Sequence, residues 1–308
     1  MAVHVRVGVF SPSVVLSLAE GVGLLERAGL TVEEAPAASS SAQFDDLRSG
    51  RLDAVITSPD NVCAYRASPA NPLGEVLDVR ILAAVDRGLG LSLFAAPGVG
   101  SDEDLRGGIL AVDVPSSGYA FVAYELLAQR GLVAGRDYEV RAAGPTPQRA
   151  RSLVAGECAM TALNAGSDLR AEAAGCRRLG RATSLGPYVG SVLAAPGATV
   201  DREPVWLSAL TTSVTQTCTE IAAGRLREPA AELAGARLGL DPAAASTYAD
   251  VLASADEGVV PDGVLDTASL GTLRELRRRH EANGRALDAV VAPGSGLVDP
   301  RFLPQGAT

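Results

Sequence analysis

The sequence predicts an α/β protein built as two doubly wound lobes joined by a hinge, with a C-terminal third that is mainly helical. Three observations support this prediction. Strand-like and helix-like segments alternate over roughly residues 3–200. One early stretch of sequence is repeated in pattern 106 residues later. The chain of 308 residues also exceeds the usual size of one compact core.

The echo joins LRSGRLDAVITSPDN at 47–61 to LVAGECAMTALNAGS at 153–167. In both copies a leucine precedes a glycine by three residues, and a small polar residue follows a short apolar run. The matched pairs, each 106 residues apart, are Leu47 with Leu153, Gly50 with Gly156, and Ser58 with Asn164. Each copy is predicted to form a helix, a tight turn, a strand and a polar loop. The sequence therefore predicts a duplication of whole lobes.

Each predicted lobe opens with the same order of elements. Valines alternate over residues 3–9, as in a strand, and Ser11 followed by Pro12 predicts the N-cap of a helix that ends at Gly29. Lobe two repeats this order as a strand at 107–114, the turn PSSG, a helix at 119–131 and a strand at 137–143. Short connections between alternating strands and helices predict parallel sheets covered on both faces.

Two apolar stretches are predicted to carry the chain between the lobes, one at 79–98 with Gly88 and Gly90 at its centre, the other at 186–197. Lobe one then comprises 1–90 plus 190–308 and lobe two 97–188, with hinge crossings near 86–97 and 186–196. In the C-terminal third, helices are expected over 206–221, after Asp241 and after Asp266. The arginines at 277–279 are expected on a solvated face.

Composition excludes several classes of function. A net charge of −9 with 4% aromatic residues argues against nucleic acid as a partner, and the apolar runs are too short for direct membrane insertion. Four cysteines without CxxC spacing and two histidines predict buried thiols and no metal site. Every basic residue apart from the histidines is arginine, which excludes a lysine Schiff base, and no nucleotide-binding glycine motif or nucleophile elbow is present. We therefore predict no cofactor.

Ligands of doubly wound sheets bind beyond the carboxyl ends of the strands. The predicted ligand-binding residues follow strands, and they are Ser11, Ser13, Ser58, Asp60, Asn61, Asp86, Ser116, Ser117, Gly118, Tyr119, Asn164 and Tyr188. The turn VDVPSSGYAF is expected either to bind an anion through hydroxyls and free amides or to form an ordinary helix cap. Asp86 either recognises an amine or orients a donor in the site, or it pairs with Arg87. Asp113 either faces the cleft or hydrogen-bonds its own turn, and the turn is favoured.

Five segments carry a family resemblance: LRSGRLDAVITS, ILAAVDRGLGLSLFAAPGV, DLRGGILAVDVPSSGYAF, LNAGSDLRAEAAGCRRLG and LGPYVGSVLAAP. In order and spacing they resemble type 2 periplasmic solute-binding proteins, in the branch that serves nitrate, sulfonate, taurine and thiamine-precursor uptake. The resemblance spans most of residues 5–200. It implies two hinged lobes that close on a small polar organic ligand. Of the family's ligand loops, the turn with Ser116, Ser117 and Gly118 matches best, and the positions of Ser58 and Asn164 also match.

Two functions are compatible with this resemblance. The first is binding of a small polar, anionic organic molecule for an ABC-type transporter, with a membrane permease as the partner. The second is a cytoplasmic lyase (a dehydratase or decarboxylase) or an isomerase acting on a small carboxylated metabolite. Asp60, Asp86 or Asp113 would then be the base, and the closed cleft would desolvate the substrate. The same fold includes chorismate dehydratase and dihydroxynaphthoate synthase.

The two functions imply different locations. The N-terminal segment MAVHVRVGVFSPS lacks the charged, apolar and cleavage regions of a signal peptide, so the sequence as written predicts a cytoplasmic protein. A binding protein would be periplasmic or extracellular, with its signal removed. The absence of a recognisable catalytic constellation favours binding, and the sequence places binding ahead of catalysis.

Overall fold

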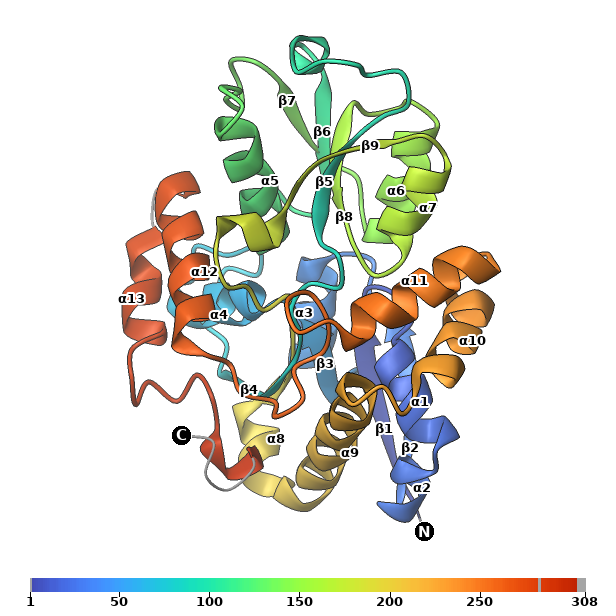
Figure 1. The fold of residues 1–308 in the computed structure, drawn as a ribbon. Coiled ribbons are helices and arrows are strands. Elements are labelled where there is room, and N and C mark those ends of the chain that lie inside the picture. The colour runs from blue at the N-terminus through green and yellow to red at the C-terminus, as the bar shows by residue number, and fades with distance from the viewer. Residues whose placement is uncertain (1, 282–283, 304–308) are drawn as a thin grey trace.

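The computed structural model describes residues 2–281 and 284–303. Its strands form two five-stranded sheets, with the orders β2-β1-β3-β10-β4 and β7-β6-β8-β5-β9. Figure 1 shows the two sheets one above the other, with helices against both. We call the first sheet and the helices packed on it lobe one, and the second sheet with its helices lobe two.

The sheet of lobe one consists of β1 (Val3–Val9), β2 (Leu30–Pro36), β3 (Ala54–Thr57), β4 (Val79–Asp86) and β10 (Ser191–Pro196). Its early helices are α1 (Val14–Gly21), α2 (Leu24–Arg27), α3 (Ser40–Arg48) and α4 (Pro59–Ala67). Strand β1 is parallel to β2 and β3, but β10 is antiparallel to β3 and β4. The predicted all-parallel sheet is therefore wrong at β10, because this strand is the chain returning from lobe two and enters the sheet from the opposite end.

Lobe two repeats this arrangement. Its strands are β5 (Ser92–Ala95), β6 (Ile109–Val112), β7 (Glu139–Ala142), β8 (Met160–Leu163) and β9 (Arg177–Arg181). Its helices are η1 (Glu103–Leu105), α5 (Gly118–Ala128), α6 (Thr146–Val154), α7 (Ser167–Ala173) and η2 (Ala182–Leu185). Strand β5 is antiparallel to β8 and β9, since it too enters its sheet directly from the other lobe.

The predicted duplication is present in three dimensions. Both bounds of α6 lie 106 residues beyond those of α3, and both bounds of β8 lie 106 residues beyond those of β3. The turns between them match as well, because Gly50 and Gly156 have φ of +73° and +72°. A residue with a Cβ is strained at these angles, so glycine is needed at both turns.

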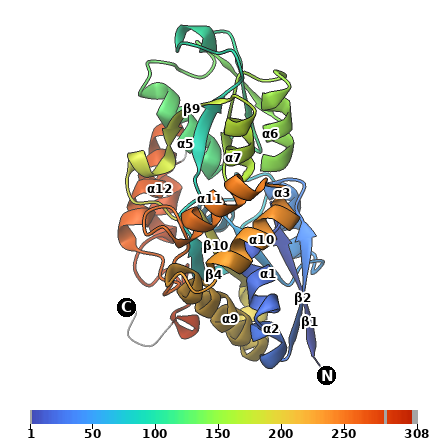
Figure 2. The same cartoon turned by 45° about the vertical axis from the view of Figure 1, so that its right-hand side comes forward.

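The C-terminal third is mainly helical, as predicted. It comprises α8 (Gly197–Arg202), α9 (Pro204–Ala222), α10 (Arg227–Leu238), α11 (Pro242–Ala253), α12 (Thr267–His280), η3 (Gly284–Ala286), α13 (Leu287–Val290) and η4 (Pro300–Phe302). Helix α9 packs on lobe one, with Leu207, Leu210 and Val214 in its core. The C-terminal helices also reach lobe two, because α12 contacts α5 and α11 contacts α7 (Figures 1 and 2).

The first helix begins later than the sequence predicts. Ser13, not Ser11, is its N-cap, and the Ser13 hydroxyl accepts a hydrogen bond of 3.2 Å from the Leu16 amide. The single helix expected as far as Gly29 is divided into α1 and α2, because Gly23 adopts φ of +71° between them. The shift places both serines in the connection between β1 and α1.

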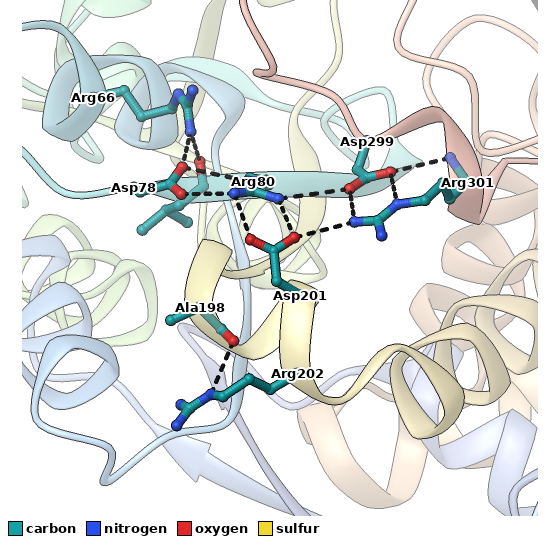
Figure 3. A network of polar contacts seen from close by, with 9 residues as sticks. Arg66, Asp78, Arg80, Ala198, Asp201, Arg202, Asp299 and Arg301 are labelled. Carbon is teal, nitrogen blue, oxygen red and sulfur yellow. Dashed lines mark hydrogen bonds and ion pairs between the residues drawn. The ribbon is translucent and has the colours of Figure 1, made fainter.

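Charged side chains fasten the C-terminal segment to the edge strand of lobe one (Figure 3). Arg80 on β4 contacts Asp201 of α8 through two hydrogen bonds of 2.8 and 3.0 Å, and Asp201 also contacts Arg301 of η4. Arg301 in turn contacts Asp299 at 2.5 Å. Asp201 and Arg301 are well exposed, so the contribution of their ion pairs to stability is modest.

Other sequence expectations can be compared with the described residues. The four cysteines are buried free thiols, as predicted. Within residues 2–281 and 284–303, no three or more histidine, cysteine, aspartate or glutamate side chains are grouped to hold a metal ion. None of the helices in that part of the chain combines the length and apolar character needed to cross a membrane.

Candidate ligand-binding cavity

A cavity of about 120 Å³ lies where the loops of the two lobes face each other. This is far more than a single water needs. Its lining includes nine of the twelve predicted ligand-binding residues: Ser11, Ser13, Ser58, Asn61, Asp86, Ser117, Gly118, Tyr119 and Asn164. The carboxyl ends of strands from both sheets supply these residues, which is the position that doubly wound sheets use for ligands.

Three helices begin at this cavity. Ser13 caps α1 and Ser58 caps α4 in lobe one, whereas Ser117 caps α5 in lobe two. The Ser117 hydroxyl accepts a hydrogen bond of 3.4 Å from the Ala120 amide while it lines the cavity. The two readings of the PSSG turn are therefore compatible, because one serine can cap its helix and face a ligand. Helix N-termini carry partial positive charge, so their convergence favours an anionic group.

The cavity also contains an arginine that the sequence reasoning missed. Arg149 of α6 lines it and is only 2% exposed. Its guanidinium donates to the Thr161 hydroxyl at 3.1 Å, the Gly144 carbonyl at 2.6 Å, the Thr146 hydroxyl at 3.2 Å and the Ala162 carbonyl at 3.1 Å. These bonds use four of the five N–H groups of an arginine. They hold the charge at the cavity wall and leave one N–H, on Nη1, for another acceptor.

Arg149 is charged but has only neutral partners. It forms no ion pair with any residue in the described part of the chain, whereas most other buried or half-buried arginines of this protein contact a carboxylate. Burial lowers the pKa of Arg149 to about 10, and the nearby Asp113 carboxylate opposes that shift. The guanidinium is thus protonated at neutral pH and presents to the cavity a positive charge that no carboxylate of the described residues contacts.

A sequence signal for Arg149 existed. The residue lies on the buried face of α6, with Ala150 beside it and Leu153 one turn later. Apolar residues normally occupy such a face. An arginine placed within that pattern indicates a charge held in the interior, which occurs when the charge is paired or functional.

Two carboxylates share the cavity with Arg149. Asp86, at the end of β4, accepts hydrogen bonds from the Ser191 hydroxyl and, at 2.7 Å, from the Gly88 amide. Burial raises the pKa of Asp86, and these two bonds oppose the rise. Arg87, the sequence's alternative partner for Asp86, contacts Asp266 instead at 3.5 Å. Among the described residues, Asp86 therefore faces the cavity without a cation in contact with it.

Asp113, at the end of the strand that contains β6, behaves differently from the prediction. It does not hydrogen-bond its own turn; its Oδ2 accepts from the Ser40 amide of lobe one at 3.1 Å, across the gap between the lobes. The correction has a simple cause, because the N-terminus of α3 supplies an unpaired amide opposite the end of the strand. Burial raises the pKa of Asp113, while the Ser40 amide and Arg149 oppose the rise.

Tyr119 and Asn164 connect the cavity to the two segments that run between the sheets. The Asn164 side-chain amide donates to the Gly88 carbonyl at 3.1 Å and to the Tyr119 hydroxyl at 3.3 Å. The Tyr119 hydroxyl donates to the Gly190 carbonyl at 3.3 Å. Both side chains of lobe two thus bind the main chain of the segments that join the lobes.

The other three predicted residues lie outside the cavity. Asp60 is fully engaged by Arg277 through hydrogen bonds of 2.8 and 2.7 Å, with both side chains buried. The solvated face expected for Arg277 is therefore wrong, since α12 packs this residue between the lobes, where it also donates to the Ser116 carbonyl at 3.1 Å. Tyr188 is buried next to Gly88 on another side of the crossing. Asp60, Ser116 and Tyr188 therefore do not line this cavity.

Two α/β lobes, two antiparallel return strands and a cavity between the lobes define the fold of type 2 periplasmic solute-binding proteins. No protein-family model matches the sequence, and no curated protein matches it either. Solved structures do match. The periplasmic nitrate-binding protein NrtA from Synechocystis PCC 6803 superposes with a TM-score of 0.78 at 14% identity, over 98% of this chain and 87% of that one.

Two further structures are similar in the same way. The alkanesulfonate-binding protein SsuA from Xanthomonas axonopodis pv. citri, bound to MOPS, gives a TM-score of 0.71 at 16% identity over 92% of this chain and 94% of that one. The ligand-binding component of an ABC-type import system from Staphylococcus aureus, with zinc bound, gives 0.74 at 12% identity over 99% of both chains. At such identities the likeness establishes the fold, which is the fold that the sequence motifs predicted.

Proposed function

We propose that this protein is a solute-binding protein that holds a small organic anion in the cavity between its lobes. The observation that carries the proposal is Arg149, a buried guanidinium that lines the cavity with neutral partners alone. A buried charge is costly unless an opposite charge compensates it. A carboxylate, sulfonate or phosphonate in the cavity supplies that charge and accepts the remaining N–H of Arg149.

Neighbouring groups fit the same anion. The Thr146 hydroxyl accepts a hydrogen bond from Arg149, so its own hydrogen is free to donate. Ser117 and the amides at the start of α5 add further donors. The rest of the lining includes Val9, Phe10 and Ile56, which suit the carbon skeleton of an organic molecule better than a bare inorganic ion.

The structural neighbours support the transport role. Their names describe binding of nitrate, binding of alkanesulfonate, and the ligand-binding component of an ABC-type import system. By this proposal the partner is a membrane permease and the working location is the periplasm or the outer cell surface. The hinge crossings then allow the lobes to close on the solute, and the closed form is recognised by the permease.

The test is a binding screen with a paired variant. Purified protein is titrated with alkyl carboxylates from formate to hexanoate, with the matching sulfonates and phosphonates, and with nitrate, and binding is followed by thermal stabilisation and calorimetry. We expect at least one organic anion to bind, and Arg149→Gln to abolish its binding at the same concentrations. The proposal is wrong if no anion stabilises the wild type, or if Arg149→Gln binds the same anion equally well.

A lyase is the second candidate function. The observation in its favour is that Asp86 and Asp113, two of the three predicted bases, line the cavity, Asp86 buried and Asp113 half-buried, and that burial raises the pKa of both. A raised pKa suits a general base near neutral pH. Incubation with enol-ether and aromatic carboxylates, followed by mass spectrometry, would detect loss of water or carbon dioxide. Unchanged substrate masses together with measurable affinity would exclude this candidate.

A further inference from the structure

Helix α12 packs into the hydrophobic cores of both lobes. Leu273 is buried in a core of lobe one together with Val192 of β10. Leu276, three residues later and within one turn of the helix, is buried in the core of lobe two together with Phe121 of α5. A single turn of α12 therefore contributes to two cores, and a rotation that parts the lobes would pull one of its leucines out of its core.

A buried ion pair joins the same turn of α12 to both lobes. Arg277 donates to the Asp60 carboxylate of α4 at 2.8 and 2.7 Å, and the two side chains are 3% and 1% exposed. The guanidinium also donates to the Ser116 carbonyl of lobe two at 3.1 Å and lies 4.9 Å from the ring centroid of Phe121. Parting the lobes separates Arg277 from its partners on one side. Because breaking a buried ion pair is strongly unfavourable, this contact resists separation.

The end of α12 holds a carboxylate of lobe two. Glu125 of α5 is 8% exposed, and both of its oxygens have partners on α12. Arg279 contacts one oxygen at 2.7 Å, and Nε2 of His280 contacts the other at 2.9 Å. The His280 ring also stacks on the Phe121 ring, with the centroids 6.4 Å apart. All of these contacts are lost if α5 moves away from α12.

The two segments that run between the sheets permit rotation. Gly88 and Gly90 in the first segment have φ of +104° and +79°, and Gly186 in the second has φ of +136°, conformations that glycine adopts without strain. Such positions can absorb the backbone rotation of a hinge, so contacts elsewhere must resist it. The hydrogen bond between the Ser40 amide and Asp113 also crosses between the lobes, but it is a single bond. Helix α12 adds apolar packing, a buried ion pair and a carboxylate bonded twice.

We propose that α12 is a latch that holds the two lobes together in the ligand-free protein. Lobe two is fastened to lobe one before any solute arrives, and α12 has to release α5 before the cavity opens. The inference goes beyond the proposed function and does not depend on it, because it concerns the shape of the protein alone. It gives a role to Asp60 and Arg277, which are buried but do not line the cavity.

Spin labels on the two lobes test the latch. Val76 of lobe one and Val133 of lobe two are exposed, and the four native cysteines are buried, so Val76→Cys and Val133→Cys add two accessible thiols for labelling. Pulsed electron paramagnetic resonance measures the distance between the labels without added ligand, and small-angle scattering measures the radius of gyration. We expect Arg277→Met to lengthen that distance and to increase the radius of gyration, because the variant keeps an apolar side chain but loses the ion pair.

Arg66→Met is the matched control. Arg66 is 15% exposed and also forms an ion pair, at 2.6 Å, but its partner Asp78 belongs to the same lobe. The label distance and the radius of gyration of this variant should equal those of the wild type. A folded Arg277→Met variant that keeps the wild-type label distance would overturn the proposal.

A second variant decides the matter if Arg277→Met does not fold. Arg279→Ser combined with His280→Ser removes both α12 partners of Glu125, and the side chains of Arg279 and His280 are 54% and 17% exposed, so the core is left in place. We expect the label distance to lengthen here too, by less than in Arg277→Met. Wild-type distances in this variant would refute the latch, as would a ligand-free wild type whose scattering shows the lobes apart. Neither result affects the anion screen, so the proposed function is tested separately.

Discussion

Helix α3 with strand β3 in lobe one, and helix α6 with strand β8 in lobe two, are the same structure built twice with different chemistry. Gln43 and Arg149 occupy equivalent positions, 106 residues apart, on the buried faces of the two helices. Gln43 donates to the carbonyl of Ile56 at 3.2 Å, and Arg149 donates to the carbonyl of Ala162, its counterpart, at 3.1 Å. The bond that ties each helix to its strand is thus conserved between the two halves of the molecule.

The two side chains differ in their other contacts. The Gln43 amide also donates to the Gly8 carbonyl, and Gln43 does not line the cavity, so all of its described contacts lie within lobe one. Arg149 keeps the structural bond and adds a charge at the cavity wall. Under the proposed function, this is how a duplicated unit acquires an anion site, because one longer and charged side chain at the same position lines the cavity without disturbing the helix.

The starts of the two helices differ in a complementary way. Ser40, at the start of α3, donates its amide to the Asp113 carboxylate of the other lobe. Thr146, the equivalent residue of α6, faces the cavity, and α6 has no side-chain N-cap bond. Lobe one therefore has its anion supplied from within the molecule. Lobe two has a comparable position open to a ligand.

The largest effect on ligand affinity is expected from replacing Arg149, and replacing its counterpart Gln43 provides the comparison. Arg149→Gln places the side chain of lobe one into lobe two and should weaken ligand binding by about 2–5 kcal/mol, because the ligand anion loses its charged partner. Gln43→Met should lower the free energy of unfolding by losing two buried hydrogen bonds, yet leave the dissociation constant within about twofold. Calorimetry and urea unfolding measure the two quantities. Equal losses of affinity in both variants would show that the lobes are not specialised.

The next largest effect on ligand affinity is expected from adding a side chain to Gly118, which lies where the lobes meet. A Cβ on Gly118 of α5 would lie 2.6 Å from the Cβ of Asp60, which Arg277 holds in place across the cleft. Gly118→Ala should therefore keep the lobes apart and weaken binding by about 1–3 kcal/mol, the usual cost of overpacking. Small-angle scattering with ligand should show a larger radius of gyration than in the wild type.

Gly21 of α1 provides the control for this prediction. A Cβ there meets no atom within 4 Å, so Gly21→Ala should leave both affinity and shape unchanged. If Gly118→Ala closes on the ligand with the wild-type radius of gyration, the contact between α5 and α4 does not control closure.

Two serine caps allow a similar comparison. Ser117 caps α5 and lines the cavity, whereas Ser39 caps α3, where its hydroxyl accepts from the Ala42 amide at 3.1 Å, away from the cavity. Replacing either with alanine should lower the free energy of unfolding by about 0.5–2 kcal/mol. Ser117→Ala alone should also weaken an anionic ligand, by about 1–3 kcal/mol. Equal affinity of Ser117→Ala and the wild type in calorimetry would remove this hydroxyl from the site.

The smallest effect concerns pH. Asp168 of α7 is buried, and burial raises its pKa from 3.8 to about 6, whereas its counterpart in lobe one, 106 residues earlier, is the apolar Val62. Between these two pKa values the folded protein retains a proton that the unfolded chain releases. Stability should therefore fall as the pH rises from about 4 to 6, by about 1 kcal/mol per pH unit at the steepest point.

Asp168→Asn isolates this contribution. Urea unfolding at successive pH values should show a flatter dependence in the variant than in the wild type over that interval. Identical slopes would mean that Asp168 does not titrate there, because Arg178 or the neighbouring amides hold it ionised.

The sequence allowed prediction of the fold because the spacing of apolar residues and the positions of turn residues are local properties. The 106-residue echo located two lobes, and its glycines marked turns that require positive φ. The nine cavity residues that were predicted follow strands, which is enough to place them at the ligand edge of an α/β sheet. The direction of β10 and β5 was missed, since strand direction depends on which end of a sheet the chain re-enters.

By itself, the sequence determined two α/β lobes, a helical C-terminal third and a set of polar loops at one edge of each sheet, because these follow from local spacing of apolar, polar and turn residues. Only the tertiary structure decided which polar groups are free. Arg277 and Asp60 neutralise each other between the lobes, whereas Arg149 and Oδ1 of Asp113 do not. The reason is physical: a side chain's charge and its hydrogen-bond partners depend on distances between segments far apart in the chain, which no local pattern specifies.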